Sequence, residues 1–237
     1  MIGYINKIET MGLVDGPGIR IVFFLQGCPL RCLFCHNPET WSLTKSNLKM
    51  TSDEIVQKIL RYKNYLGEDG GVTFSGGEPL AQADFLLETL KKCKEAGIHT
   101  CIDTSGFGTY SEEIFNYIDL VLLDVKALNE DAYKKITGQS YESFYKFLTS
   151  CEEKQVKVWI RQVIIPGIND TEEYILKLKE FLKPYQCIEK IELLPYHTMG
   201  IKKYEELGLK YRLNSVPAMD LEECKRLEEL IRSDNEI

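Results

Sequence analysis

Two hydrophobic patterns alternate along the chain. Short runs rich in valine, isoleucine and leucine, such as residues 19–25, are typical of buried strands. Between them lie longer stretches in which apolar residues recur every three or four positions, as Ile55, Ile59 and Tyr62 do, which is typical of a helix. The pattern predicts strands at 19–25, 71–74, 98–102, 120–125, 156–164 and 188–194, and helices at 53–65, 84–96, 111–117, 141–154, 171–182 and 220–232.

This alternation sets the fold class. A strand followed by a helix, repeated about six times with short connections, predicts an α/β fold with a parallel sheet and crossover helices. An open doubly wound sheet and a complete or partial (β/α) barrel both fit the pattern. Since barrel-like α/β folds often use about 200–250 residues as one unit, we expect residues 1–237 to form a single domain.

Composition and charge narrow the class of protein. Hydrophobic residues make up 44% of the chain and charged residues 27%, which excludes collagen, coiled coil and bulk disorder. A net charge of −7 argues against the clustered basic surface that nucleic-acid binding needs. The most apolar run, 19–25, contains Arg20 and is too short to span a membrane, and the first residues lack the apolar core of a signal peptide. We therefore expect a cytoplasmic protein without membrane or nucleic-acid partners.

The eight cysteines divide into two groups. In a reducing compartment they are thiols, metal ligands or catalytic groups rather than disulfides. Five are scattered singly along the chain, and we expect them to be small buried hydrophobic residues. The other three, Cys28, Cys32 and Cys35, fall within eight residues, so they are the candidates for chemistry.

Three interpretations of the C-x3-C-x2-C spacing compete. A zinc ion with His36 as fourth ligand is one, although zinc usually takes its ligands from two separated pairs. Haem attachment through C-x-x-C-H is another, but it normally follows export and leaves Cys28 unexplained. An iron–sulfur cluster held by three thiolates uses every cysteine and leaves one iron open to a non-protein ligand. We favour the cluster.

Polar residues follow each predicted strand. The carboxyl ends of parallel strands meet at one edge of a sheet, where α/β folds bind their ligands. The cysteines follow the first strand, and the later strand ends supply residues 75–78, 103–106, 124–126, 161 and 195–197. This convergence predicts a ligand site at that edge, whatever the meaning of any single motif.

Longer motifs carry a resemblance to a known family. Beside the three cysteines they are VDGPGIR at 14–20, FLQGC at 24–28, CHNP at 35–38, SGGE at 75–78, GIHTCIDT at 97–104, LDVK at 123–126, VKVWIR at 156–161 and IELLPYH at 191–197. With them the chain resembles the radical S-adenosylmethionine (radical SAM) superfamily, and within it the glycyl-radical activases that act on pyruvate formate-lyase. The resemblance covers nearly the whole chain. Because no cysteine lies between His36 and Ser75, we expect no ferredoxin-like insertion of the kind found in some other activases.

The resemblance implies a fold, cofactors and partners. The fold is a partial (β/α)6 parallel barrel of the radical SAM type. Cys28, Cys32 and Cys35 hold a catalytic [4Fe–4S] cluster whose open iron binds S-adenosyl-L-methionine (SAM). The reaction is reductive cleavage of SAM, after which a hydrogen atom is taken from a glycine Cα of the partner. The partners implied are pyruvate formate-lyase as protein substrate and a flavodoxin or ferredoxin as electron donor.

The resemblance also implies roles for single residues. Phe34 is expected to pack on the adenine, His36 and His197 to contact the ligand, and Lys126 and Arg161 to bind the SAM carboxylate. The other expected SAM contacts are Gly76, Gly77, Glu78, Asp124 and Val125. A cation site is expected on Asp103, Thr104 and Asp124, and a contact with the partner protein through Asp15 and Arg20.

Simpler interpretations of these residues stay open. Asp124 and Lys126 share a strand face and can form an internal ion pair, residues 15–20 can be a hairpin turn, and the Gly76-Gly77 pair a plain turn. His99 is expected to be a core histidine. Two other functions also stay open, namely activation of a different glycyl-radical enzyme, and an iron–sulfur module for electron transfer or redox sensing.

Overall fold

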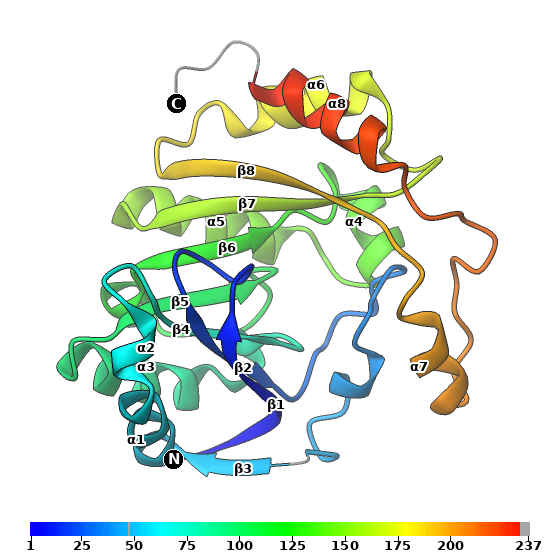
Figure 1. Cartoon of the computed structure of the whole chain (residues 1–237). Helices are drawn as coiled ribbons and strands as arrows, with labels where there is room; N and C mark the ends of the chain where they lie inside the picture. Colours follow the sequence, from blue (N-terminus) through cyan, green and yellow to red (C-terminus); the bar gives the residue numbers. More distant parts are fainter. Residues whose placement is uncertain (47, 233–237) are drawn as a thin grey trace.

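One eight-stranded sheet organises the molecule. The computed structural model describes residues 1–46 and 48–232, and its strands lie in the order β3-β1-β2-β4-β5-β6-β7-β8 (Figure 1). The strands are β1 (Ile2–Gly12), β2 (Arg20–Leu25), β3 (Leu48–Thr51), β4 (Gly71–Gly76), β5 (His99–Thr104), β6 (Leu120–Asp124), β7 (Lys157–Ile164) and β8 (Ile188–Pro195).

The run from β2 to β8 is parallel throughout, as the six predicted strands required. The sheet curves but stays open, with β3 and β8 at its two ends, so the predicted partial (β/α)6 barrel is confirmed and a closed barrel is excluded for the described residues. The parallel strands are almost completely buried, because crossover helices cover their outer face while the site and core fill the inner one.

Eight α-helices are present in the described residues, and most of them cross over between parallel strands. They are α1 (Ser52–Arg61), α2 (Lys63–Leu66), α3 (Ala83–Glu95), α4 (Glu130–Thr137), α5 (Glu142–Lys154), α6 (Glu172–Leu182), α7 (Ile201–Glu206) and α8 (Leu221–Arg232). Figure 1 shows α4 and α5 behind β6 and β7, and α6 with α8 beyond β8. None of these helices is long and apolar enough to cross a membrane.

The first predicted helix begins where its capping residues indicate. Thr51 accepts a hydrogen bond from the backbone N–H of Glu54, and the Glu54 carboxylate accepts one from the backbone of Thr51. This reciprocal pair satisfies two helix-end donors that otherwise have no partner. The predicted helix at 53–65 is nevertheless divided at Tyr62 into α1 and α2, and the predicted helix at 111–117 is a 3-10 helix, Glu112–Tyr117.

An antiparallel hairpin adds two strands that the hydrophobic pattern does not predict. β1 pairs antiparallel with β2 on one side and with β3 on the other. The connection between β1 and β2, residues 13–19, contains most of the VDGPGIR motif, so the hairpin-turn interpretation of this motif is confirmed. We call residues 13–19 the β1–β2 loop.

Side chains bridge the open side of the curved sheet. The segment that follows β8 lies against the cysteine loop that follows β2 (Figure 1). Lys203 of α7 donates hydrogen bonds to Asn37 at 2.9 Å and to Glu39 at 2.5 Å, and Tyr204 packs edge-on against Trp41. These side-chain contacts, rather than hydrogen bonds between neighbouring strands, hold the two ends of the curved sheet together.

Candidate functional site

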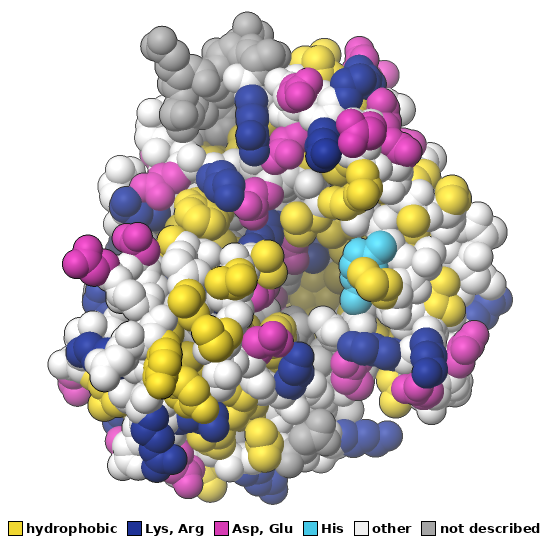
Figure 2. All heavy atoms as spheres, in the orientation of Figure 1, with side chains coloured by type: hydrophobic (Ala, Val, Ile, Leu, Met, Phe, Trp, Pro, Cys, Tyr) yellow, Lys and Arg dark blue, Asp and Glu magenta, His cyan; other side chains and the backbone are white. Residues whose placement is uncertain are grey.

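A cavity of about 230 Å³ opens at the carboxyl ends of the parallel strands. Figure 2 shows it as a hollow with histidine side chains on its border and hydrophobic side chains around its rim. Most of the predicted site residues line this one cavity: Cys28, Cys32, Phe34, Cys35, His36, Gly76, Gly77, Glu78, Asp103, Thr104, Asp124, Lys126 and Arg161. The expectation that polar strand ends converge is therefore confirmed.

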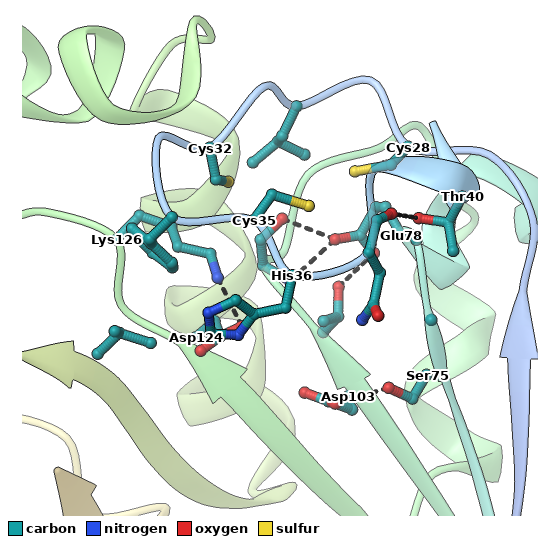
Figure 3. A pocket seen from close by; sticks show the side chains of 18 of the residues that line it. Cys28, Cys32, Cys35, His36, Thr40, Ser75, Glu78, Asp103, Asp124 and Lys126 are labelled. Atoms are coloured by element: carbon teal, nitrogen blue, oxygen red, sulfur yellow. Dashed lines mark hydrogen bonds and ion pairs between the residues drawn. The ribbon is translucent and has the colours of Figure 1, made fainter. Parts of the chain in front are cut away.

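The three clustered cysteines face a common space (Figure 3). All are partly exposed free thiols, whereas the five scattered cysteines are buried, as expected. The loop that carries them is fixed through its backbone, since Arg31 N–H donates to Thr137 O at 2.7 Å and Leu33 N–H to Ile136 O at 2.9 Å. These two hydrogen bonds tie the backbone of the cysteine loop to the end of α4.

The three thiols are not placed as ligands of one metal ion. Within residues 1–46 and 48–232, no three His, Cys, Asp or Glu side chains are grouped so that they could hold one metal ion. A zinc site requires all its ligands within about 2.0–2.3 Å of one ion, whereas an iron–sulfur cluster takes each thiolate at a different iron. The described residues therefore show no ready-made zinc site at the three cysteines.

The surroundings of the thiols fit a cluster as well. Burial raises the pKa of Cys32 to about 12, and it raises the pKa of Cys28 and Cys35. The ligands are thus neutral thiols until iron displaces their protons. The indole N–H of Trp41 lies beside Cys35 and is buried without a hydrogen-bond partner among the described residues, which suits a donor to a charged sulfur.

Gly76 and Gly77 let two strand-end loops approach closely. Gly77 N–H donates to Leu25 O at 2.9 Å and Glu78 N–H to Gly27 O at 2.9 Å, so the turn after β4 continues the sheet beside the cysteine loop. A Cβ atom at Gly77 would lie 2.3 Å from Gly27 O, and Gly76 has a φ of 110°. The glycines therefore hold the cysteine loop in place as well as facing the cavity.

The Glu78 carboxylate is turned into the protein. It is 1% exposed and accepts hydrogen bonds from Leu80 N–H, Thr104 Oγ1, Ser105 N–H and Ser105 Oγ. Burial raises its pKa, and the hydrogen bonds from Ser105 and Thr104 oppose that rise. The expected SAM contact through this carboxylate is not what the structure shows, because all its acceptor positions already have protein donors (Figure 3).

Asp124 and Lys126 form the ion pair that their spacing allowed. The Lys126 ammonium lies 2.6 Å from Asp124 Oδ2 and 5.2 Å from the centroid of the Phe34 ring. Burial acts to lower the pKa of Lys126, but Asp124 and Cys32 hold it above its ordinary value. Val125, between them, points into the core and is fully buried, so only its backbone is available to a ligand.

Arg161 lies at the centre of a second polar group. Its guanidinium is 3.2 Å from Glu192 and 3.8 Å from Asp103, and it also donates to Val14 O. Asp103 accepts a hydrogen bond from Ser75 at 2.7 Å, and burial raises its pKa. Several donors of Arg161 are thus engaged within the protein.

The cation site expected on Asp103, Thr104 and Asp124 stays a prediction. Asp103 and Asp124 both line the cavity, but the Thr104 hydroxyl donates to Glu78 at 2.5 Å instead of facing them.

His36 and His197 stack beside the cavity. Their rings are 3.8 Å apart, and His36 Nε2 lies 2.8 Å from His197 O. Burial lowers the pKa of both histidines. His197 Nδ1 is buried without a partner in the described part of the chain, so it is free to meet a polar atom of a ligand. The two predicted rim histidines are therefore brought together from opposite ends of the sheet.

Arg20 is not at the surface. It is 0% exposed, and its guanidinium contacts Thr73, Pro17 O, Val72 O and His99. The expected contact with a partner protein through Arg20 is thus incompatible with this structure, because strand β2 directs the side chain into the core. Asp15 lies in the loop above it, and burial raises its pKa. His99 is half-buried and held by Arg20.

Sequence comparisons identify the family. Residues 22–181 match the model of the radical SAM superfamily. The pyruvate formate-lyase-activating enzyme of Clostridium pasteurianum is 52% identical over 98% of both chains, and that of Staphylococcus epidermidis is 44% identical over 94% of this chain and 92% of its own. This chain belongs to the pyruvate formate-lyase-activating enzymes of the radical SAM superfamily. The expected resemblance is confirmed.

Solved structures agree with this radical SAM assignment. A domain of the pyruvate formate-lyase-activating enzyme of Bacteroides vulgatus matches 69% of this chain and 94% of its own, with 27% identity and a TM-score of 0.56. SuiB of Streptococcus suis, bound to its precursor peptide, matches 90% of this chain and 44% of its own with a TM-score of 0.67, and at 20% identity it shows the fold alone. As a radical SAM enzyme the chain uses a [4Fe–4S] cluster and SAM, so the predicted cofactors are confirmed and zinc and haem are excluded.

Proposed function

We propose that this protein activates pyruvate formate-lyase by generating a glycyl radical on it. The observation that carries the proposal is the set of three thiols facing one cavity at the strand ends, in a chain 52% identical to such an activase. When bound, the reduced cluster supplies one electron that cleaves SAM into methionine and a 5′-deoxyadenosyl radical, which takes a hydrogen atom from a glycine Cα of the partner. The protein itself binds and orients the cofactors and the substrate, and it excludes water from the site.

The cavity supports a division of roles among its side chains. We assign the three cysteines to the cluster. We assign Lys126, Asp124 and Phe34 to SAM, because the Lys126 ammonium contacts both the Asp124 carboxylate and the Phe34 ring on one side of the cavity. Arg161 adds a second positive charge for the SAM carboxylate. Gly76, Gly77 and Val125 contact SAM through polar backbone atoms, because the glycines have no side chain and the Val125 side chain is buried in the core. His36 and His197 offer ring nitrogens on the far side, since the pKa of each is lowered and the rings are neutral at pH 7.

The wider setting also belongs to the proposal. The chain works as one domain, since all its described strands join one sheet. A flavodoxin or ferredoxin supplies the electron, and the enzyme works in the cytoplasm, where thiols stay reduced.

Anaerobic reconstitution tests the proposal. The protein is loaded with iron and sulfide, reduced, and mixed with SAM and pyruvate formate-lyase. We expect 5′-deoxyadenosine by chromatography and a glycyl radical by electron paramagnetic resonance. An intact cluster without 5′-deoxyadenosine would show an electron-transfer module instead. Cleavage of SAM with a radical only on another glycyl-radical enzyme would show that the partner is wrong.

A pair of variants tests whether Lys126 binds SAM. Lys126→Met keeps the length of the side chain but removes the charge that faces the cavity. We expect the cluster to assemble while SAM binding weakens at least tenfold, as judged by the change that SAM causes in the spectrum of the reduced cluster. Lys202→Met, an exposed lysine on α7, is the control with the same change of charge. Equal SAM affinity in both variants would contradict the assignment.

A further inference from the structure

Helix α7 packs directly against the segment that carries the last clustered cysteine, residues 35–41 (Figure 1). A Cβ atom at Gly200, which precedes α7, would lie 3.0 Å from His36 Cα and 3.5 Å from Cys35 O. Three residues later, Lys203 donates hydrogen bonds to two side chains of the same segment. The helix is therefore held against the cysteine loop at two points, and it cannot move away without losing both contacts.

Trp41, at the end of this segment, carries a buried donor that lacks an acceptor. Its indole nitrogen has no hydrogen-bond partner among residues 1–46 and 48–232, and Cys35 lies beside it. The Arg31 guanidinium lies 4.7 Å from the ring centroid, and the Tyr204 ring packs edge-on at 5.8 Å. Because these two neighbours hold the ring in place, the N–H stays buried, and a buried donor needs an acceptor.

A second donor reaches Cys35 from α7. Tyr204 is 3% exposed, and burial raises the pKa of its phenol, with Cys35 adding to the rise because the sulfur lies beside the hydroxyl. The ring is held by Tyr211, whose ring centroid is 4.8 Å away. Trp41 belongs to the loop after β2 and Tyr204 to the segment after β8, so the two donors approach one sulfur from the two sides of the open sheet.

The chemistry of an iron-bound sulfur gives these donors an effect. A cysteine that binds iron is a thiolate, and a hydrogen bond to a charged acceptor is stronger than one to a neutral thiol. Hydrogen bonds to the sulfurs are among the features that set the reduction potential of an iron–sulfur cluster. Each such bond favours the reduced state, because that state carries one more negative charge. Neither Trp41 nor Tyr204 lines the cavity, so neither acts by contact with SAM.

We propose that Trp41 and Tyr204 are positioning residues for the cluster, which donate hydrogen bonds to the Cys35 sulfur and thereby raise the reduction potential of the cluster. The donor from Tyr204 is present only while α7 lies against the cysteine loop. The potential therefore depends on a contact made across the open side of the sheet. The inference rests on the proposed function, in which Cys35 is a ligand of the cluster.

Tyr204→Phe tests the inference, because it keeps the ring and removes only the hydroxyl. The midpoint potential is measured without SAM or partner protein, by a redox titration that follows the reduced cluster by electron paramagnetic resonance. At the wild-type midpoint we expect the ratio of reduced to oxidised cluster to fall about fivefold, which is about 40 mV at 59 mV per tenfold for one electron. Tyr174→Phe is the control, since that hydroxyl, on α6, bonds to Gln162 at 3.3 Å and should leave the potential unchanged.

Two further measurements make the test specific. Hyperfine spectroscopy of the reduced cluster in H2O and D2O should show one exchangeable proton fewer in Tyr204→Phe, and Trp41→Phe should lose another and also lower the potential. Lys203→Met removes an anchor of α7, so it should lower the potential of the otherwise wild-type chain and have at most half that effect in the Tyr204→Phe background. Loss of the lysine charge alone would act equally in both backgrounds.

The outcomes separate this inference from the proposed function. An unchanged potential in Tyr204→Phe with four irons bound, or the same exchangeable protons as in the wild type, would overturn the inference. An equal effect of Lys203→Met in both backgrounds would overturn its dependence on α7. A four-iron cluster retained in Cys35→Ala, or an intact wild-type cluster that cleaves no SAM, would instead refute the proposed function.

Discussion

Replacing Glu78 with glutamine should destabilise the site more than its small chemical change suggests. The carboxylate accepts two hydrogen bonds at each oxygen, and one of each pair comes from a backbone N–H, that of Leu80 at 3.1 Å and that of Ser105 at 2.9 Å. A backbone N–H cannot reverse its direction. Whichever way the new side-chain amide is turned, its NH2 group therefore faces a buried donor.

The magnitude follows from this geometry. One charge-assisted hydrogen bond, worth about 1.5–3 kcal/mol, is lost, and a buried donor is left without an acceptor. We expect the free energy of unfolding to fall by roughly 3 kcal/mol, which corresponds to about 6–12 °C in the melting temperature of a chain of this size. Because Glu78 N–H also pairs with Gly27 O, the cysteine loop should loosen and iron content after reconstitution should fall.

Thermal unfolding under anaerobic, reducing conditions measures the first effect, and iron analysis the second. Glu95→Gln, at an exposed position on α3, makes the same change of charge and should melt within about 1 °C of the wild type. If Glu78→Gln and Glu95→Gln melt at the same temperature, the four hydrogen bonds of the Glu78 carboxylate do not stabilise the fold.

Three further predictions concern the cluster loop and the core. Cys28→Ala should lose the four-iron cluster while Cys93→Ala, buried in α3, keeps it, and iron content after reconstitution decides between them. Gly77→Ala should bind little iron, because the new Cβ would lie 2.3 Å from Gly27 O. Gly67→Ala, with open space but a glycine-type backbone at φ 68° and ψ −162°, should lose about 1–3 kcal/mol of stability and still bind iron normally. Burial lowers the pKa of His99, so the stability this neutral ring provides is complete above its unfolded pKa of about 6.5 and declines at lower pH. Chemical denaturation between pH 7.5 and 5.5 should therefore show that the free energy of unfolding falls more steeply with decreasing pH in the wild type than in His99→Gln. Equal slopes would contradict a lowered pKa of His99 in the folded protein.

The parallel core of the fold is predictable because its chemistry is local. Strands buried on both faces need continuous apolar runs, and β2, β4, β5, β6, β7 and β8 each lie within a few residues of such a run. β1 and β3 have no such signal, since one mixes charged and apolar residues and the other has only four residues. Their place depends on pairing with β2, which is a long-range contact.

Two short helices do not follow from the hydrophobic pattern. For α4 a signal exists in its ends, because Asn129 caps the first turn and Gly138 takes the left-handed conformation after the last. α7 has neither feature, and its position depends on contacts with the cysteine loop.

The site is predictable as a set of positions but not as a set of side-chain directions. Strand ends in a parallel sheet must meet, so the sequence alone is enough to group the cysteines with Asp124 and Lys126. Glu78 and Arg20 bond inward instead, because neighbouring loops and strands offer them donors and acceptors that only the folded chain brings near. The partnership of Tyr196 and Tyr211, whose hydroxyls lie 2.8 Å apart in the buried interior, has no sequence signal at all.

The open sheet has a mechanical consequence. In the described part of the chain no strand joins β3 to β8, and the gap is spanned by the stacked imidazoles, by Lys203 and by a contact from Arg212 to Arg31 O. The exposed cation contacts of Lys203 and Arg212 each cost about 1 kcal/mol or less to separate, and the packing of Tyr204 against Trp41 adds to that cost. The two ends of the open sheet can therefore move apart when a few side-chain contacts break, whereas a closed barrel would first have to lose the backbone hydrogen bonds between two strands. Raised ionic strength should make this movement easier, because it weakens the contacts of the cations.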